Sequence, residues 1–124
     1  MKSVLIDTDI LINFLRGDVR SKELLLSLAE ESSIYCSVIT VAEIHAGMRA
    51  HEREKTKELI DSLNIAEVSL EIAEKAGKYK RDERGYALEL DDCLLAATAF
   101  VKGAVLVTGN VKHYPMQDIR KQVQ

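Results

Sequence analysis

The sequence predicts an α/β fold with a largely parallel sheet. Short apolar runs recur along the 124 residues, and the segments between them place apolar side chains at helical spacing. Glycines and small polar residues stand where these helices would begin or end. Strands that alternate with helices pair in parallel, because each helix returns the chain to the same end of the sheet.

Four apolar runs are the expected buried strands. The first ends directly in acid at Asp7, and the second is rich in the β-branched and aromatic residues that favour strands. The tail from Gln117 is polar and is expected to add at most one short strand at an edge of the sheet. The four runs are residues 3–6, 34–38, 65–68 and 104–107.

Six further segments are the expected helices. Gly17 ends the first and Gly103 the last, since glycine adopts the left-handed conformation that is common at helix ends. Ser69 begins the fifth as a cap. The last helix is apolar on nearly every side and is expected to be buried. The helices cover about residues 9–16, 22–31, 40–49, 52–63, 70–85 and 91–102.

Length and composition indicate one domain over residues 1–124. A chain with 47% apolar residues and no visible repeat or linker can bury a single core. No apolar run reaches the roughly 18 residues that a membrane span needs. Cys36 and Cys93 lie in apolar segments, so we expect buried, reduced thiols and a cytoplasmic setting. The net charge of −3 neither supports nor excludes a polyanionic partner.

Four polar side chains, far apart in the sequence, are expected at one edge of this sheet. Asp7 directly follows the first strand, and Asn110 follows the last apolar strand. Glu43 lies in the first turn of the helix that leaves the second strand, and Asp92 in the first turn of the helix that precedes the last. In a parallel sheet all four positions fall at the carboxyl ends of the strands, where such folds bind ligands.

Oxygen-bearing side chains at one edge favour a hard divalent cation. Crowded carboxylates repel one another, and some would stay protonated at neutral pH unless a cation lay between them. Mg²⁺ and Mn²⁺ prefer oxygen ligands, lower the pKa of bound water and offset charge on a phosphate under attack. His45, His51 and His113 lack the spacing of a zinc site and are expected at the surface or at helix caps.

Each acid also has a structural explanation when it is taken alone. Thr40 and Glu43 fit a capping box, in which the Glu43 carboxylate accepts a hydrogen bond from the Thr40 amide. Asp91 and Asp92 stand at a helix N-terminus, where the helix dipole favours negative charge. Residues 7–9 have the composition of a cap between a strand and a helix. None of these explanations accounts for the shared edge.

A basic run on the fifth predicted helix allows two interpretations. Acidic residues interleave it, which is typical of a solvated helix face. The alternative is a track for an RNA backbone. The run consists of Lys75, Lys78, Lys80, Arg81 and Arg84.

Four stretches make the chain resemble the PIN-domain ribonucleases, close to the VapC-type toxins of toxin–antitoxin pairs. The resemblance implies a three-layer α/β/α fold with a largely parallel sheet of about five strands. It also implies Mg²⁺- or Mn²⁺-dependent cleavage of RNA, frequent homodimers and inhibition by an antitoxin protein. The stretches are VLIDTDILINFLRG, SVITVAEIHAG, DDCLLAATA and VLVTGNVKHYPMQDI, which together span nearly the whole chain.

The resemblance assigns roles to individual residues. Asp7, Glu43 and Asp92 match the three acidic positions that hold the metal ion, and Asn110 matches a fourth position that is often Asp. Asparagine there removes one negative charge, which weakens the case for a second tightly held ion. Supporting roles, in orienting ligands or contacting phosphate or metal-bound water, are expected for Thr8, Asp9 and Thr108.

The expected function is therefore an endoribonuclease, the toxin of a type II toxin–antitoxin system, that cleaves RNA with a metal-activated water. One alternative is a non-catalytic PIN module that binds RNA or a partner protein. Residues 6–9 also resemble the start of haloacid-dehalogenase phosphatases, with Asp7 as nucleophile. That family needs Thr or Val at the position of Leu11 and acidic residues at positions 108–109. This chain has neither, so the match is limited to residues 6–9.

Overall fold

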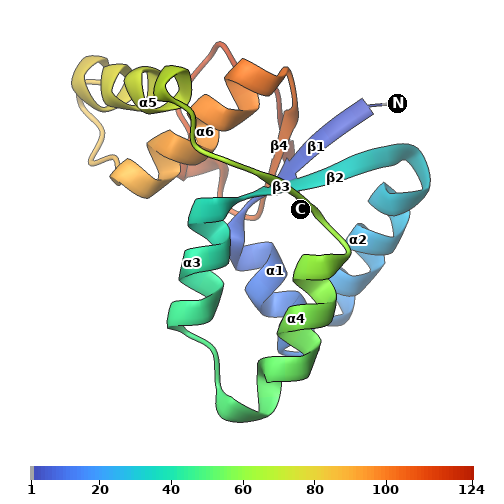
Figure 1. Cartoon of the computed structure of the whole chain (residues 1–124). Coiled ribbons are helices and arrows are strands. Elements are labelled where there is room, and N and C mark those ends of the chain that lie inside the picture. Colours follow the sequence, from blue (N-terminus) through green and yellow to red (C-terminus); the bar gives the residue numbers. More distant parts are fainter. Residues whose placement is uncertain (1) are drawn as a thin grey trace.

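The computed structural model describes residues 2–124 and confirms the α/β fold. In these residues five parallel strands form one sheet in the order β3-β2-β1-β4-β5 (Figure 1). The predicted strands are all present, including a short C-terminal strand at one edge. Their bounds are β1 (Lys2–Ile6), β2 (Ser32–Ser37), β3 (Asn64–Ala66), β4 (Val105–Thr108) and β5 (Lys121–Val123).

Helices cover both faces of the sheet, which confirms the three-layer arrangement. Over residues 2–124, none of these helices is long and apolar enough to cross a bilayer. Figure 1 shows α5 and α6 together on one side of the sheet and α1 to α4 on the other. The bounds are α1 (Thr8–Leu15), α2 (Val19–Glu31), α3 (Val38–Ala46), α4 (Arg53–Asp61), α5 (Leu70–Asp82) and α6 (Leu90–Lys102), with short 3₁₀ helices η1 (Ala50–Glu52) and η2 (Val111–His113).

The central strand β1 is buried on both faces. Its side chains alternate, so Val4 and Ile6 pack with α1 and α2 whereas Leu5 packs with α5 and α6. All three side chains are fully buried. A strand covered on both faces needs apolar residues at every position, which explains the unbroken apolar run in the sequence.

The start of α3 differs from the prediction. The helix begins at Val38, because the Ser37 hydroxyl accepts a hydrogen bond from the Ile39 amide at 3.0 Å and caps it. Thr40 is therefore a buried helical residue and the predicted capping box is wrong. Glu43 lies in the second turn of the helix rather than in the first.

The basic run on α5 is a paired and solvated face, as the first interpretation held. The Lys75 ammonium lies 2.8 Å from the Asp118 carboxylate and 4.1 Å from the centre of the Phe100 ring. Lys78 pairs with Asp82 one turn later at 2.9 Å. The Lys75 contacts hold α5 against α6 and the C-terminal segment. Both pairs leave less positive charge free for an RNA backbone.

Both cysteines are buried free thiols, which confirms the prediction. Burial raises the pKa of Cys36 to about 11, so its thiol stays protonated at neutral pH. Burial also raises the pKa of Cys93. A protonated thiol is a poor nucleophile, so neither residue is a candidate for catalysis.

Gly103, at the end of α6, and Gly77, inside α5, form a matched pair for testing the backbone conformation of glycines. Gly103 ends α6 in the left-handed region with φ +64°, whereas Gly77 is helical, and a Cβ at either position would meet no atom within 4 Å. We expect Gly103→Ala to lower the free energy of unfolding by about 1 kcal/mol through backbone strain. Gly77→Ala should raise it by about 0.5–1 kcal/mol. Urea unfolding measures both changes, and a loss in both variants would contradict the assigned conformations.

Candidate metal centre

The three predicted acids line one groove at the carboxyl edge of the sheet. Asp7 directly follows β1, Glu43 comes from α3, and Asp92 lies in the first turn of α6. Figure 1 shows the first turns of α3 and α6 near each other at this edge, beside the end of β1. The groove has a volume of about 200 Å³, and its lining consists of Asp7, Thr8, Asp9, Glu43, Glu89, Asp91, Asp92 and His113.

Asp7 is the most buried of the three acids, with 6% of its surface exposed. Its Oδ1 accepts a hydrogen bond from the Thr8 amide at 2.8 Å, which makes it the cap of α1. Its Oδ2 accepts a second hydrogen bond from the Thr108 hydroxyl of β4 at 2.7 Å. Burial raises the pKa of Asp7, and the charge of Asp9 raises it further.

Glu43 ends a chain of hydroxyl groups. The Thr8 hydroxyl donates to Oε1 of Glu43 at 2.7 Å and lies 2.9 Å from the Thr40 hydroxyl. Since Thr8 has a single hydroxyl proton, Thr40 must be the donor in that second bond. Burial raises the pKa of Glu43, and the charges of Asp91 and Asp92 add to the effect.

Asp92 accepts its hydrogen bond from the segment after β4. The Tyr114 hydroxyl donates to its Oδ1 at 3.3 Å, and Nδ1 of His113 lies 3.6 Å from its Oδ2. Burial raises the pKa of Asp92, as does the charge of Asp7. Burial and the two nearby carboxylates of Asp7 and Asp92 raise the pKa of Tyr114 well above its usual range, so the phenol keeps its proton.

Asn110 lies at the predicted edge but points its amide elsewhere. Its Nδ2 is 3.0 Å from Nε2 of His113, and its backbone amide donates to the Thr108 hydroxyl at 3.0 Å. The Asn110 side chain is not part of the groove lining. The structure therefore brings the three acids together with Thr8, Asp9 and Thr108. Asn110 lies outside the groove, in contact with the lining residue His113.

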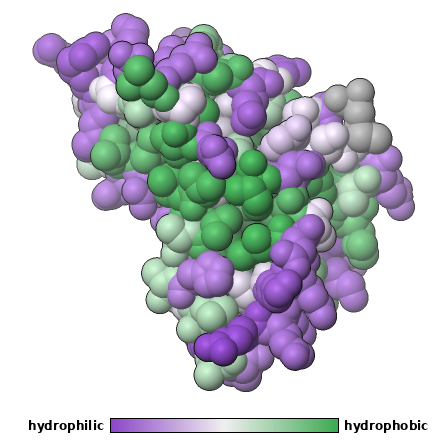
Figure 2. Space-filling view, in the orientation of Figure 1, coloured by the Kyte–Doolittle hydropathy of each residue, from purple (hydrophilic) through white to green (hydrophobic). Residues whose placement is uncertain are grey.

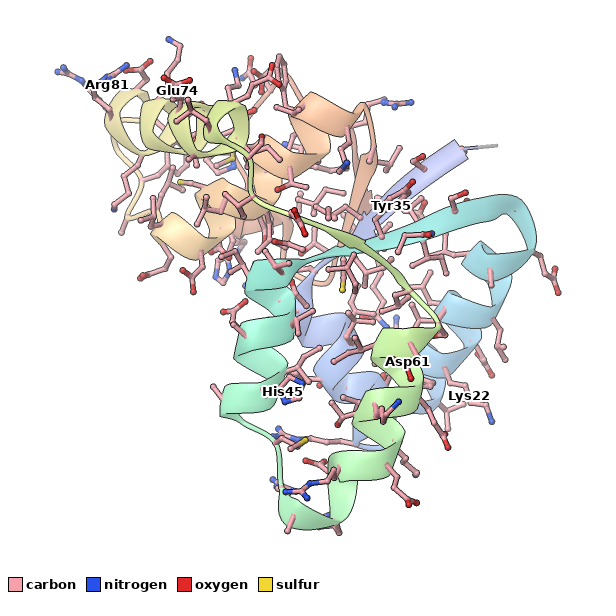
Figure 3. The ribbon with its side chains drawn as sticks, in the orientation of Figure 1. Lys22, Tyr35, His45, Asp61, Glu74 and Arg81 are labelled. Atoms are coloured by element: carbon pink, nitrogen blue, oxygen red, sulfur yellow. The ribbon has the colours of Figure 1, made fainter. Side chains whose placement is uncertain are left out.

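Three residues near the acids were not assigned to a site from the sequence. Thr40 was expected to cap a helix, His113 was expected at the surface or at a cap, and Tyr114 had no assigned role. His45, by contrast, lies lower on α3, on the side of α4 (Figure 3). Tyr114 could have been found from its residue type, because a buried tyrosine hydroxyl needs a hydrogen-bond partner and acids were expected nearby.

The donor set fits a hard cation that keeps part of its water shell. Within residues 2–124, no three His, Cys, Asp or Glu side chains are close enough to form a complete ligand cluster as they stand. Besides burial, the charge of Asp7 raises the pKa of Asp92, and the charge of Asp92 raises that of Glu43, so the three acids lie within range of one another's charges. Mg²⁺ commonly binds through one or two carboxylates and several waters, which suits such an open arrangement.

Comparison with known proteins identifies relatives over most of the chain. The model of the PIN domain family matches residues 4–117. Ribonuclease VapC10 of Mycobacterium tuberculosis is 37% identical over 117 residues, which cover 91% of this chain and 86% of that protein. Ribonuclease VapC1 of Methanocaldococcus jannaschii is 30% identical over 114 residues, covering 90% and 78%.

Solved structures share the fold. VapBC2 from Rickettsia felis, bound to a DNA fragment from its promoter, superposes with a TM-score of 0.87 at 21% identity, covering 98% of each chain. A toxin–antitoxin complex from Klebsiella pneumoniae gives a TM-score of 0.80 at 28% identity, covering 94% of each chain.

The raised pKa values predict that the acids cost stability at neutral pH. A carboxyl group whose pKa is higher in the folded state favours folding less as the pH rises through that pKa, so the cost is present at pH 7 and disappears near pH 4. In EDTA at pH 7, we expect Asp92→Asn to leave the thermal midpoint unchanged or to raise it, with the difference shrinking on acidification. Thermal unfolding followed by circular dichroism measures it.

Asp91→Asn is the matched control, because Asp91 is exposed in the same helical turn. It removes the same favourable charge from the helix N-terminus, but it relieves Glu43 and Asp92 only through the charge of an exposed neighbour, so any gain should be smaller. A loss of about 1 kcal/mol in Asp92→Asn would instead mean that Asp92 serves mainly as a cap.

Proposed function

The chain belongs to the PIN-domain family, and on that basis we propose that it is a Mg²⁺- or Mn²⁺-dependent endoribonuclease, the toxin of a type II toxin–antitoxin pair. The observation that carries the proposal is the groove in which Asp7, Glu43 and Asp92 converge from three distant segments. The ribonuclease names of its relatives support RNA as the substrate. Family membership rules out the haloacid-dehalogenase alternative.

Asp7, Glu43 and Asp92 would hold the cation. When bound, Mg²⁺ or Mn²⁺ lowers the pKa of water and offsets the charge that develops on a phosphate under attack. Thr8 and Thr108 orient the carboxylates of Glu43 and Asp7 through their hydrogen bonds of 2.7 Å. Water would attack the phosphorus atom and the bond from phosphorus to the 3′ oxygen would break, which leaves a 5′-phosphate and a 3′-hydroxyl.

Asn110 and His113 would act at the rim of the groove. Nε2 of His113 accepts a hydrogen bond from the Asn110 amide in the tautomer that turns its Nδ1–H toward Asp92. In this arrangement Asn110 positions water or phosphate through its contacts, and it adds no negative charge to repel the RNA. His113 is half-exposed, so an incoming phosphate can reach it.

An antitoxin is the proposed protein partner. The Klebsiella pneumoniae structure is a toxin–antitoxin complex, and its 28% identity supports the same kind of partner for this chain. The proposed setting is the cytoplasm, where cysteines such as the two free ones of this chain stay reduced.

A homodimer is proposed through the face that carries β3. Figure 2 shows a broad apolar area at the centre of this face, between the α5–α6 layer and the lower helices. β3 is an edge strand, its Ile65 is 37% exposed, and Leu70 at the start of α5 is 77% exposed. Exposed apolar patches of this kind commonly mark protein interfaces.

Asp7→Asn tests the ribonuclease activity. The change keeps the size of the side chain but removes the most buried charge of the groove, so we expect RNA cleavage with Mn²⁺ to fall by about a hundredfold or more. EDTA should abolish cleavage by the wild type. Cleavage of a labelled RNA is followed on denaturing gels.

Asp18→Asn is the matched control, because Asp18 caps α2 away from the groove and Asn caps equally well. Its activity should equal that of the wild type. Unchanged cleavage in Asp7→Asn would overturn the proposed site, and no cleavage by the wild type on any RNA tested with Mn²⁺ would favour the non-catalytic module.

Ile65→Glu tests the homodimer. A charge in the middle of the apolar face should weaken self-association at least roughly tenfold, because it would be buried without a partner. Leu26→Glu on α2 is the control, since Leu26 is 59% exposed on another helix and should not affect dimerisation. Sedimentation velocity over a range of concentrations measures both, and equal dimerisation of the two variants would place the interface elsewhere.

A further inference from the structure

We propose that Tyr114 is a positioning residue of the metal centre, which holds the carboxylate of Asp92 beside that of Asp7 so that both are ready for the cation. The inference rests on the proposed function of this groove. Tyr114 lies in the segment that follows η2, and its side chain is fully buried. Its hydroxyl is the donor to Oδ1 of Asp92 at 3.3 Å.

The pattern of donors around the acids supports this role. Each candidate ligand accepts a hydrogen bond from the hydroxyl of a residue on another segment. Thr8 donates to Glu43, and Thr108 donates to Asp7. Tyr114 supplies the corresponding bond for Asp92. Its hydroxyl favours the charged form of Asp92 and also that of Asp7, against the larger effect of burial, which raises the pKa of both acids.

Packing of the Tyr114 ring and hydrogen bonds of its backbone hold its hydroxyl in place beside Asp92. The ring packs in the core that contains Leu106 of β4 and Met116. The ammonium group of Lys121 donates to the backbone carbonyls of Tyr114 and Met116, both at 2.9 Å. The Tyr114 amide donates to the Val111 carbonyl at 3.0 Å. A donor held this firmly restricts the rotamers of the carboxylate that it contacts.

A phenol suits the task because it is neutral. A Lys or Arg in its place would pair with Asp92 and compete with the cation for the carboxylate. A Phe would fill the same space but leave Asp92 free to turn away from Asp7. Hydrogen bonds to metal-binding carboxylates are typically worth ten- to a hundredfold in metal affinity.

Tyr114→Phe tests the inference, with Tyr79→Phe as the matched control. Tyr79 is also a buried phenol that donates to a carboxylate, Asp118, at 2.7 Å, but it lies outside the groove. We expect Tyr114→Phe to weaken Mn²⁺ binding roughly tenfold in calorimetry without RNA, and Tyr79→Phe to leave it unchanged. Far-ultraviolet circular dichroism in EDTA should show the native fold for both variants.

Dependence on the metal concentration separates positioning from a general loss of structure. Tyr114→Phe should need roughly tenfold more Mn²⁺ for half-maximal RNA cleavage and should approach the wild-type rate when Mn²⁺ is saturating. Unchanged Mn²⁺ affinity in Tyr114→Phe, or a loss that excess Mn²⁺ does not restore, would overturn the inference. Absence of Mn²⁺ binding by the wild-type protein would overturn the metal centre itself, which is a distinct result.

Discussion

The burial of neighbouring carboxylates is the constraint around which this molecule is built. Burial raises the pKa of Asp7, Glu43 and Asp92. The charge of Asp7 adds to the effect at Asp92, and the charges of Asp91 and Asp92 add to it at Glu43. Such groups stay together only if the backbone that carries them cannot relax. The fully buried strand β1 provides that rigidity, because apolar residues pack against both of its faces. Core packing on both sides of the sheet therefore offsets the electrostatic cost of the groove.

Neutral donors preserve the negative potential of the groove while fixing its geometry. Within residues 2–124, no Lys or Arg forms an ion pair with Asp7, Glu43 or Asp92. Their hydrogen bonds come from hydroxyl groups and, at Asp7, also from a backbone amide, which orient an oxygen without cancelling its charge. Lysines are plentiful elsewhere, as on α5, where they pair with local acids. This separation of charge leaves the groove open to a cation, with His113 as the one basic side chain among the described residues that line it.

The fold and the acids were predictable because they depend on simple patterns. Apolar runs located four of the five strands, and parallel topology placed Asp7 and Asp92 at one edge. The fifth strand lies in the polar tail, where only a short edge strand was expected. The start of α3 was not predictable to the residue, because Ser37 and Thr40 are both good caps and the competition between them is decided by where β2 ends. Tyr114 was missed for a different reason: the 3₁₀ turn η2 that folds it back under Asp92 has no periodicity to reveal it.

The long sequence separation across the centre has a consequence for how the protein is made. The hydrogen bond between Thr108 and Asp7 joins residues 101 positions apart, and Tyr114 follows later still. A chain growing on the ribosome lacks β4, the neighbour of β1 in the sheet, until residues 105–108 have been synthesised. Until then, the Asp7 carboxylate lacks the Thr108 hydroxyl that orients it, and the Asp92 carboxylate lacks the hydroxyl of Tyr114. The groove proposed to cleave RNA therefore assembles late in translation.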